Sequence, residues 1–145
     1  MKRITLLLSL LIITLTNVSA DNDKPITVEQ LPATAKQFIQ NYFKGVTVSY
    51  AKQETELFDK SYEVVFTNGN KVEFNKKGEW KDVDCKFTHV PEGIIPSKIK
   101  AYITSNYKDA SIVEIDRDRN DYEVKLSNGL ELSFDLKFNL IKIDN

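Results

Sequence analysis

Two stretches of the chain alternate apolar and polar residues on both sides of an Asn-Gly pair. They run from Tyr62 to Phe74 and from Tyr122 to Phe134, and both begin with Tyr-Glu-Val. Such alternation is typical of strands with one buried face, and Asn-Gly between them favours a two-residue type I′ turn. The pattern therefore predicts two β-hairpins of the same design.

A helical pattern precedes each hairpin and begins at an apolar residue followed by proline. The pairs are Leu31-Pro32 and Ile95-Pro96, and proline is favoured in the first turn of a helix. Apolar residues then recur at helical spacing, and we expect them in the core. They are Ala35, Phe38, Ile39, Tyr42 and Phe43 in the first helix, and Ile99, Tyr102, Ile103 and Tyr107 in the second.

Further apolar runs predict one strand before and one strand after each hairpin. These strands cover residues 46–56, 80–86, 111–116 and 140–143. The same order of elements thus occurs twice, with a period near 60 residues. We expect an α+β fold of two tandem α-β-β-β-β repeats, at residues 31–87 and 95–145, with a linker at 88–94.

The start of the chain is typical of a secretory signal peptide at residues 1–20. A short basic start is followed by an apolar run over residues 4–15 and by small residues up to Ala20. This run is shorter than the roughly 20 apolar residues that a membrane-spanning helix needs. We expect cleavage before Asp21, export to the periplasm or the cell exterior without membrane insertion, and a loose leader at 21–30.

Charge and cysteine content narrow the function classes further. The 20 basic residues of the chain fall to 18 once Lys2 and Arg3 are removed, against 21 acidic residues. A mildly acidic chain lacks the clustered positive charge that nucleic acid binding requires. Cys85 is the only cysteine, so an intramolecular disulfide is excluded. We expect this thiol to be structural and half-buried.

The order of these motifs resembles the PepSY-like family of exported bacterial proteins. The shared features are the Leu/Ile-Pro helix, the strand after it, Tyr-Glu-Val before Asn-Gly, a Phe-Asn or Phe-Asp step and a closing strand, over residues 31–144. The resemblance implies the fold of the β-lactamase inhibitor protein: one curved antiparallel sheet of about eight strands with both helices on one side. The second copy has Leu136-Lys137-Phe138-Asn139 at the turn before its closing strand and lacks the glycine that Gly78 supplies in the first, which leaves the geometry of that turn open.

Side-chain alternation assigns each hairpin residue to one face of this sheet. Facing the helices we expect Tyr62, Val64, Phe66, Val72 and Phe74, and then Tyr122, Val124, Leu126, Leu130, Leu132 and Phe134. The opposite face would carry Glu63, Val65, Lys71, Glu73, Glu123, Lys125, Glu131 and Ser133. A sheet face that helices leave uncovered is either solvated or a docking surface.

Trp80 has two interpretations. On the open face, near Lys71 and Glu73, it would anchor a partner, because Trp is enriched in interface hot spots. Facing inward, it would fill the core as Leu140 would in the second repeat, because large aromatic side chains are mostly buried.

No motif for catalysis or cofactor binding is present. The chain has a single His, His89, and a single Cys, so the usual zinc ligands cannot form a cluster. Residues 116–120 begin like a calcium loop, but the sixth position lacks the required Gly and the twelfth lacks the bidentate Glu. Acids two residues apart, such as Asp82 and Asp84, are explained by solubility and edge protection. We expect no enzyme activity, no cofactor and no metal ion.

These observations favour an exported, non-enzymatic module that binds another protein, such as a peptidase or a cell-wall enzyme, through the open sheet face. The candidate partner-binding residues are Glu63, Lys71, Glu73, Trp80, Glu123, Lys125 and Glu131. An inhibitory or regulatory role would rest on the resemblance in fold alone. Two alternatives are a periplasmic sensor that binds a small molecule or ion between the halves, and a structural component of the envelope.

Overall fold

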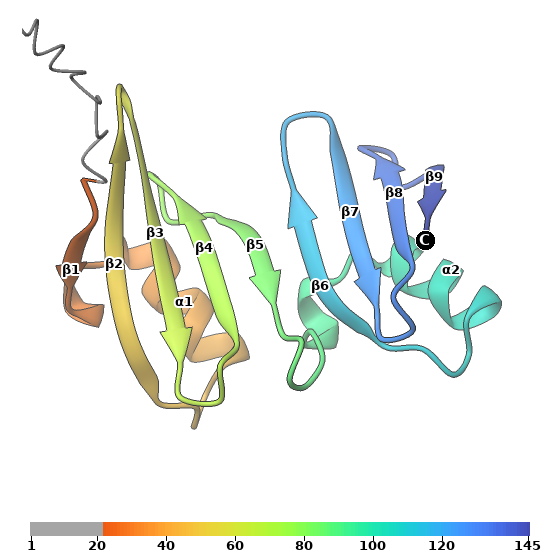
Figure 1. The fold of residues 1–145 in the computed structure, drawn as a ribbon, viewed down its shortest axis with the longest axis horizontal. Helices are drawn as coiled ribbons and strands as arrows, with labels where there is room; N and C mark the ends of the chain where they lie inside the picture. The colour runs from red at the N-terminus through yellow and green to blue at the C-terminus, as the bar shows by residue number, and fades with distance from the viewer. Residues whose placement is uncertain (1–21) are drawn as a thin grey trace, which may run out of the picture.

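The computed structural model describes residues 22–145, which form one antiparallel sheet of nine strands and two α-helices (Figure 1). The strands are β1 (Lys24–Ile26), β2 (Val48–Glu56), β3 (Asp59–Phe66), β4 (Lys71–Asn75), β5 (Trp80–Asp84), β6 (Ile112–Arg117), β7 (Asp121–Leu126), β8 (Glu131–Asp135) and β9 (Leu140–Asp144). The helices are α1 (Ala33–Tyr42) and α2 (Ser97–Asn106), preceded by 3₁₀ helices at Val28–Gln30 and Glu92–Ile94. The strands lie in the sheet in their order along the chain.

This architecture confirms the α+β class and the single antiparallel sheet that were predicted from the sequence. The signal peptide predicted at residues 1–20 and its cleavage site at Asp21 lie outside the described residues. From residue 22 onward, no helix is long and apolar enough to cross a membrane.

Both helices pack on one face of the sheet, and the core lies between these two layers. Phe38 of α1 packs edge-on against Phe74 of β4, with ring centroids 5.6 Å apart. Tyr102 of α2 packs in the same way against Phe134 of β8, at 5.7 Å. The hairpin residues buried in this core are Tyr62, Val64, Phe66, Val72, Phe74, Val124, Leu126, Leu132 and Phe134, while Tyr122 and Leu130 are half-buried against them. The predicted core face of both hairpins is therefore confirmed.

The two Asn-Gly turns differ from the prediction. Gly69 and Gly129 have φ angles of 88° and 91°, but the Asn before each has a negative φ, whereas a type I′ turn needs positive φ at both residues. The first hairpin closes over three residues, because Gly69 N–H donates to Phe66 O and Phe66 N–H donates to Asn70 O. This is a type I turn followed by a glycine bulge. Asn68 Oδ1 accepts the N–H of Asn70 and stabilises this alternative.

The turns from β4 to β5 and from β8 to β9 share this geometry, with one unusual residue. Gly78 occupies the left-handed position in the first turn at φ 82°, and Phe138 occupies it in the second at φ 66°. Corresponding backbone hydrogen bonds close both turns. The ring of Phe138 packs on Tyr122 with centroids 5.3 Å apart, so side-chain packing favours a conformation that the backbone disfavours.

The predicted loose leader contains a strand, which corrects the expectation of about eight strands. Residues 24–26 form β1 and pair antiparallel with β2, with Ile26 opposite Ala51. Ile26 is half-buried against the core, which gives the segment an apolar anchor. Pro25 is tolerated because β1 lies at the edge of the sheet.

Trp80 lies on the helix side of the sheet and not on the open face. It is directly opposite Phe74 in the pairing of β4 with β5, where Lys81 forms a bulge, and it is half-buried against the core. Arg117 covers its ring, with the guanidinium carbon 4.1 Å from the ring centroid. Arg117 Nε–H also donates to Trp80 O at 2.8 Å. Trp80 is therefore removed from the candidate residues of the open face.

Candidate functional site: the open face of the sheet

Charged side chains line the sheet face opposite the helices, and the strand register sets them in rows. One row of directly opposed residues reads Lys52, Glu63, Glu73, Asp82, Asp116, Glu123, Ser133 and Lys142. Its five consecutive acids, from Glu63 to Glu123, lie on five adjacent strands, and we call them the carboxylate row. Like charges directly opposite each other destabilise a sheet, so this row lowers the free energy of unfolding when its acids are charged.

A second row runs beside the first and mixes both signs. It reads Lys71, Asp84, Glu114, Lys125, Glu131 and Asp144. The open face is thus acidic along its middle, with lysines beside the acids.

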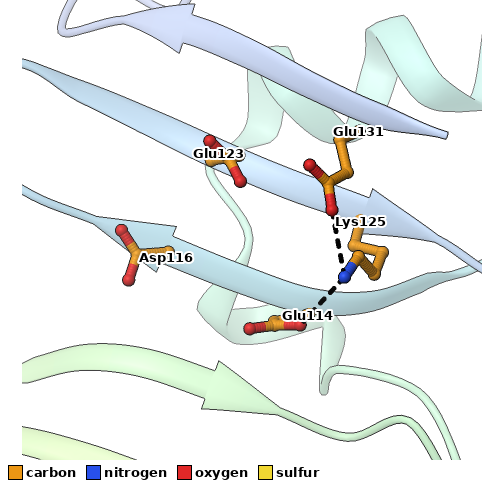
Figure 2. A pocket seen from close by; sticks show the side chains of 5 residues that line it. All are labelled: Glu114, Asp116, Glu123, Lys125 and Glu131. Atoms are coloured by element: carbon orange, nitrogen blue, oxygen red, sulfur yellow. Dashed lines mark ion pairs between the residues drawn. The ribbon is translucent and has the colours of Figure 1, made fainter. Parts of the chain in front are cut away.

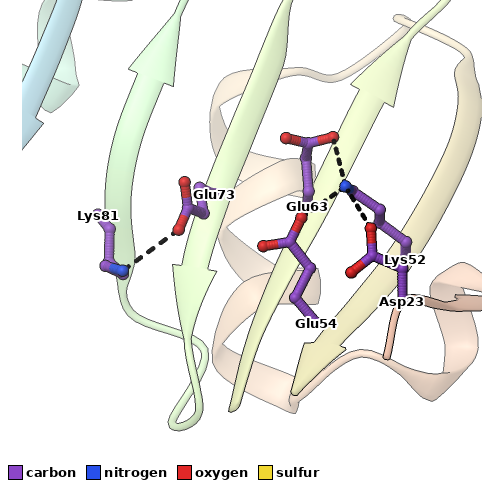
Figure 3. A network of polar contacts seen from close by, with 6 residues as sticks. All are labelled: Asp23, Lys52, Glu54, Glu63, Glu73 and Lys81. Carbon is purple, nitrogen blue, oxygen red and sulfur yellow. Dashed lines mark hydrogen bonds and ion pairs between the residues drawn. The ribbon is translucent and has the colours of Figure 1, made fainter. Parts of the chain in front are cut away.

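Lysines neutralise the first end of the carboxylate row, as Figure 3 shows. Lys52 Nζ lies 3.8 Å from Glu63 Oε1 and pairs with two further carboxylates. Lys81 Nζ lies 3.2 Å from Glu73 Oε1. These ion pairs are partly exposed, and each is worth at most about 1 kcal/mol.

The other half of the row is less well neutralised (Figure 2). Lys125 Nζ lies 3.0 Å from Glu131 Oε1 and 3.9 Å from Glu114 Oε2. Asp116 and Glu123 line the same shallow hollow, but within residues 22–145 neither forms an ion pair. Their charge is therefore available to an incoming cation.

The seam between β5 and β6 joins acid to acid on the open face. Asp82 is directly opposite Asp116, and Asp84 is directly opposite Glu114. The residues between them, including Val83, face the helices and are fully buried. The seam thus has apolar contacts on one face and acid directly opposite acid on the other.

Burial, and then this crowding of acids, changes the protonation of the seam. Burial, together with Glu114 and Asp116, raises the pKa of Asp82 to about 8. Burial, then the neighbouring charges of Asp118 and Glu123, raises the pKa of Asp116 as well. Within residues 22–145, Asp82 Oδ1 is buried and has no hydrogen-bond partner. A cation near the seam would therefore favour the charged forms of these acids.

The structure brings six of the seven predicted site residues to one face. Glu63, Glu73 and Glu123 lie in the carboxylate row, whereas Lys71, Lys125 and Glu131 lie in the mixed row. The functional candidates that the sequence analysis missed are Asp82, Asp84, Glu114 and Asp116. The spacing of Asp82 and Asp84 by two residues was a signal, but it was explained by solubility and edge protection. Edge protection is wrong for this pair, because β5 lies in the middle of the sheet.

The hairpin of β2 and β3 presents an apolar tip that the sequence analysis treated as a simple turn. It reaches beyond the neighbouring strands (Figure 1). Leu57 and Phe58 at the tip are 95% and 101% exposed, and Leu57 has a positive φ of 46°. The equivalent turn between β6 and β7 is polar, and Asp118 accepts the N–H of Asn120 there at 2.7 Å.

Among the described residues, the open face carries many carboxylates but no reactive thiol. Cys85 is fully buried, more than the half-burial predicted, and burial followed by the charges of Asp84 and Asp82 raises its pKa to about 12. An un-ionised thiol is a poor nucleophile. The described part of the chain contains no group of three His, Cys, Asp or Glu side chains arranged to hold a metal ion.

The fold and face define a class: an α+β protein whose single sheet is covered by helices on one side and acidic and open on the other. The family described as "Putative beta-lactamase-inhibitor-like, PepSY-like" matches residues 60–142. The chain belongs to this PepSY-like family, as the sequence resemblance indicated. Among curated proteins, none matches the chain.

Solved structures support the same assignment. A "putative periplasmic protein" of Bacteroides vulgatus is 56% identical, with a TM-score of 0.85, over 87% of this chain and 99% of that chain. A "putative calcium-regulated periplasmic protein" of Bacteroides thetaiotaomicron is 61% identical, with a TM-score of 0.84, over 85% and 97%. A "putative periplasmic protein of unknown function" of B. vulgatus is 39% identical, with a TM-score of 0.81, over 85% and 99%. The prediction of an exported protein is thereby confirmed.

Proposed function

We propose that this protein is a non-enzymatic binding module that holds a cationic protein surface against its open sheet face. The observation that carries the proposal is the carboxylate row, five directly opposed acids on adjacent strands. Rows of like charge are costly within a sheet, and a bound cationic surface would remove that cost.

The electrostatics of the face favour such a partner. Asp116 and Glu123 have no ion pair within the described residues, and burial, before any charge effect, raises the pKa of both. Lysine or arginine side chains of a partner would lower these pKa values and gain charge-assisted hydrogen bonds. Complementary charge also speeds association and makes it sensitive to salt.

The exported location narrows the partner to proteins of the envelope or the exterior. A peptidase or a cell-wall enzyme fits this location, and the family description as inhibitor-like supports a regulatory effect on such a partner. The low content of reactive groups on the face supports a binding role over catalysis.

Charge reversal on the row tests this proposal. The chain from Asp21 onward, a Glu73→Lys/Glu123→Lys variant and a control variant would each be used to capture proteins from native envelope extract. The control reverses Glu29 and Asp109, which are exposed in segments off the open face. Bound proteins would be quantified by mass spectrometry at low and high salt, and folding would be checked by circular dichroism.

We expect a basic protein to be held by the wild type and the control, lost by the row variant, and released by salt. Equal capture by all three proteins would overturn the choice of face. A partner lost by the control alone would move the binding surface to the helix side.

A second candidate, an ion-responsive protein, is favoured by two observations. A relative that is 61% identical is described as a "putative calcium-regulated periplasmic protein", and the seam carries four acids on two strands. Thermal unfolding of the wild type and of Asp82→Asn/Asp116→Asn would be compared with and without Ca²⁺. A midpoint raised by Ca²⁺ in the wild type only would support this candidate, whereas equal midpoints would exclude it.

We also propose that the two halves are copies of one α-β-β-β-β unit. Corresponding registers support this: Tyr62 is opposite Phe74 as Tyr122 is opposite Phe134. Each half would then contribute half of the open face, with the β5–β6 seam as the junction.

A further inference from the structure

The sheet ends at β9, an edge strand in which exposed apolar residues alternate with the charged residues Lys142 and Asp144. Every residue of β9 is exposed, and Ile141 and Ile143 are 59% and 45% exposed. An edge strand presents unpaired backbone N–H and C=O groups, which other strands readily pair with. Natural sheets usually block such edges with proline, charge or very short strands.

The opposite edge of the sheet, β1, is blocked in this way. It is only three residues long and contains Pro25, which has no N–H to donate. Lys24 adds a charge. β9 is longer, at five residues, and has no proline, and its two charges, Lys142 and Asp144, are of opposite sign. It is therefore less protected against strand pairing than β1.

β5 has the same place after the first hairpin as β9 has after the second. The way in which β5 pairs at its outer edge therefore indicates which kind of strand β9 can pair with. Trp80 begins β5 opposite Phe74, and Leu140 begins β9 opposite Phe134, after the same kind of bulge. The outer edge of β5 pairs antiparallel with β6, with Val83 opposite Ile115 at the centre. The residue of β9 that corresponds to Val83 is Ile143, because Val83 is opposite Val72 and Ile143 is opposite Leu132.

The sequence of β9 is complementary to itself in this register. In an antiparallel pair, directly opposed residues lie on the same face of the sheet. A two-fold axis through Ile143 would therefore place Ile143 against Ile143 of the second copy on the helix side. It would also place Lys142 opposite Asp144 of the second copy, twice, on the open face.

We propose that two copies of this chain pair antiparallel through β9, centred on Ile143. The central contact reproduces the apolar pair of Val83 and Ile115 at the internal seam, but the flanking pairs are attractive instead of acid against acid. Within one copy, Lys142 Nζ lies 2.7 Å from Asp144 Oδ2, so both charged groups lie together at this edge of the sheet. The dimer doubles the sheet, keeps all helices on one side, and joins the two open faces.

This proposal does not depend on what the open face binds, since it needs only the pairing of β9, whose Lys142 and Asp144 lie at the ends of the two rows. Few residues pair directly, so the interface is small and the dimer should be weak. The sequence of β9 also indicates that the strand pairing with it is β9 of a second copy. The order Lys-Ile-Asp places opposite charges against each other when it pairs antiparallel with itself.

Sedimentation equilibrium over micromolar to millimolar concentrations tests the proposal, using the chain from Asp21 onward. Lys142→Glu would place acid against acid, and Asp144→Lys would place base against base. We expect each single variant to weaken dimerisation about tenfold or more. The double variant Lys142→Glu/Asp144→Lys should regain dimerisation, and a mixture of the two single variants should form heterodimers.

Lys24→Glu on β1 is the matched control, because it reverses one charge at the other edge. It should dimerise as the wild type does. A wild type that stays monomeric throughout, or a dimer that the single variants leave unchanged, would overturn the proposal. If the double variant regains dimerisation, the loss in the single variants is due to the charge pairs of the proposed register and not to impaired folding. Circular dichroism would check the folding of each variant.

Discussion

Asp82 of β5 lies directly opposite Asp116 of β6, at the centre of the open face. Two carboxylates in this position oppose each other across the only strand pairing that connects the two halves of the described sheet. Val83 and Ile115 hold the same pairing from the buried side. The seam therefore combines a strong apolar contact with an electrostatic cost that depends on pH.

Replacement of Asp82 by Asn should stabilise the protein at alkaline pH. The pKa of Asp82 is raised to about 8, so the folded chain holds a proton that the unfolded chain loses above its ordinary pKa. The contribution of Asp82 to stability is thus complete at acid pH and is lost as the pH rises towards 8. We expect Asp82→Asn to gain about 1–2 kcal/mol at pH 8 relative to pH 4, after allowance for solvent screening.

Urea unfolding at both pH values measures this difference. Asp109→Asn, at an exposed turn, is the control and should show the wild-type pH dependence. Equal effects of Asp82→Asn at pH 4 and pH 8 would show that the seam carries no shifted proton.

Two glycines with similar backbones should respond differently to alanine. Gly78 and Gly129 have φ angles of 82° and 91°, so a side chain at either costs about 1–2 kcal/mol. A Cβ at Gly78 would also lie 2.8 Å from Pro32 Cβ and 2.9 Å from Ala35 N, whereas a Cβ at Gly129 would meet nothing within 4 Å. We expect about 1 kcal/mol lost in Gly129→Ala and about 2–4 kcal/mol in Gly78→Ala by denaturant unfolding. Similar losses would mean that α1 does not pack on this turn.

Removal of the Arg117 side chain should expose the indole of Trp80. The guanidinium covers the ring at 4.1 Å and Nε–H donates to the backbone oxygen of Trp80. Since Trp80 is the only tryptophan, Arg117→Ala should shift the emission maximum to longer wavelength and lower stability by about 1–2 kcal/mol. Arg117→Lys, which lacks the planar group, should give a smaller shift. Unchanged emission in both variants would contradict the stacking.

Substitution of Leu57 by Gly should raise the thermal midpoint. Leu57 is almost fully exposed and has a positive φ, so its side chain adds strain and little packing. Glycine at this position should gain about 0.5–1 kcal/mol. Phe58→Ser, at the fully exposed neighbour, should change stability by less than about 0.5 kcal/mol. A loss of stability in either variant would show that the tip packs on the rest of the chain.

Much of the fold followed from local patterns. Alternation assigned Val64, Phe74, Val124 and Leu132 to the core, and all four are fully buried. Alternation predicts the buried face well because a shift of the strand register by one residue would move every apolar side chain to the solvent face. The Asn-Gly turn type was predicted wrongly, since Asn68 could use its side chain to stabilise a three-residue loop. The strand at Lys24–Ile26 was missed because its short, proline-containing sequence forms a strand only when β2 is beside it.

The sequence by itself determined the class of fold and which hairpin residues face the helices, because these depend on the order of neighbouring side chains. Only the tertiary structure decided that β5 pairs with β6, and hence that Asp82 and Asp116 complete a row of acids. It also decided that Trp80 lies beneath Arg117. These contacts join residues that are about thirty or more positions apart, and no local pattern encodes the register between them.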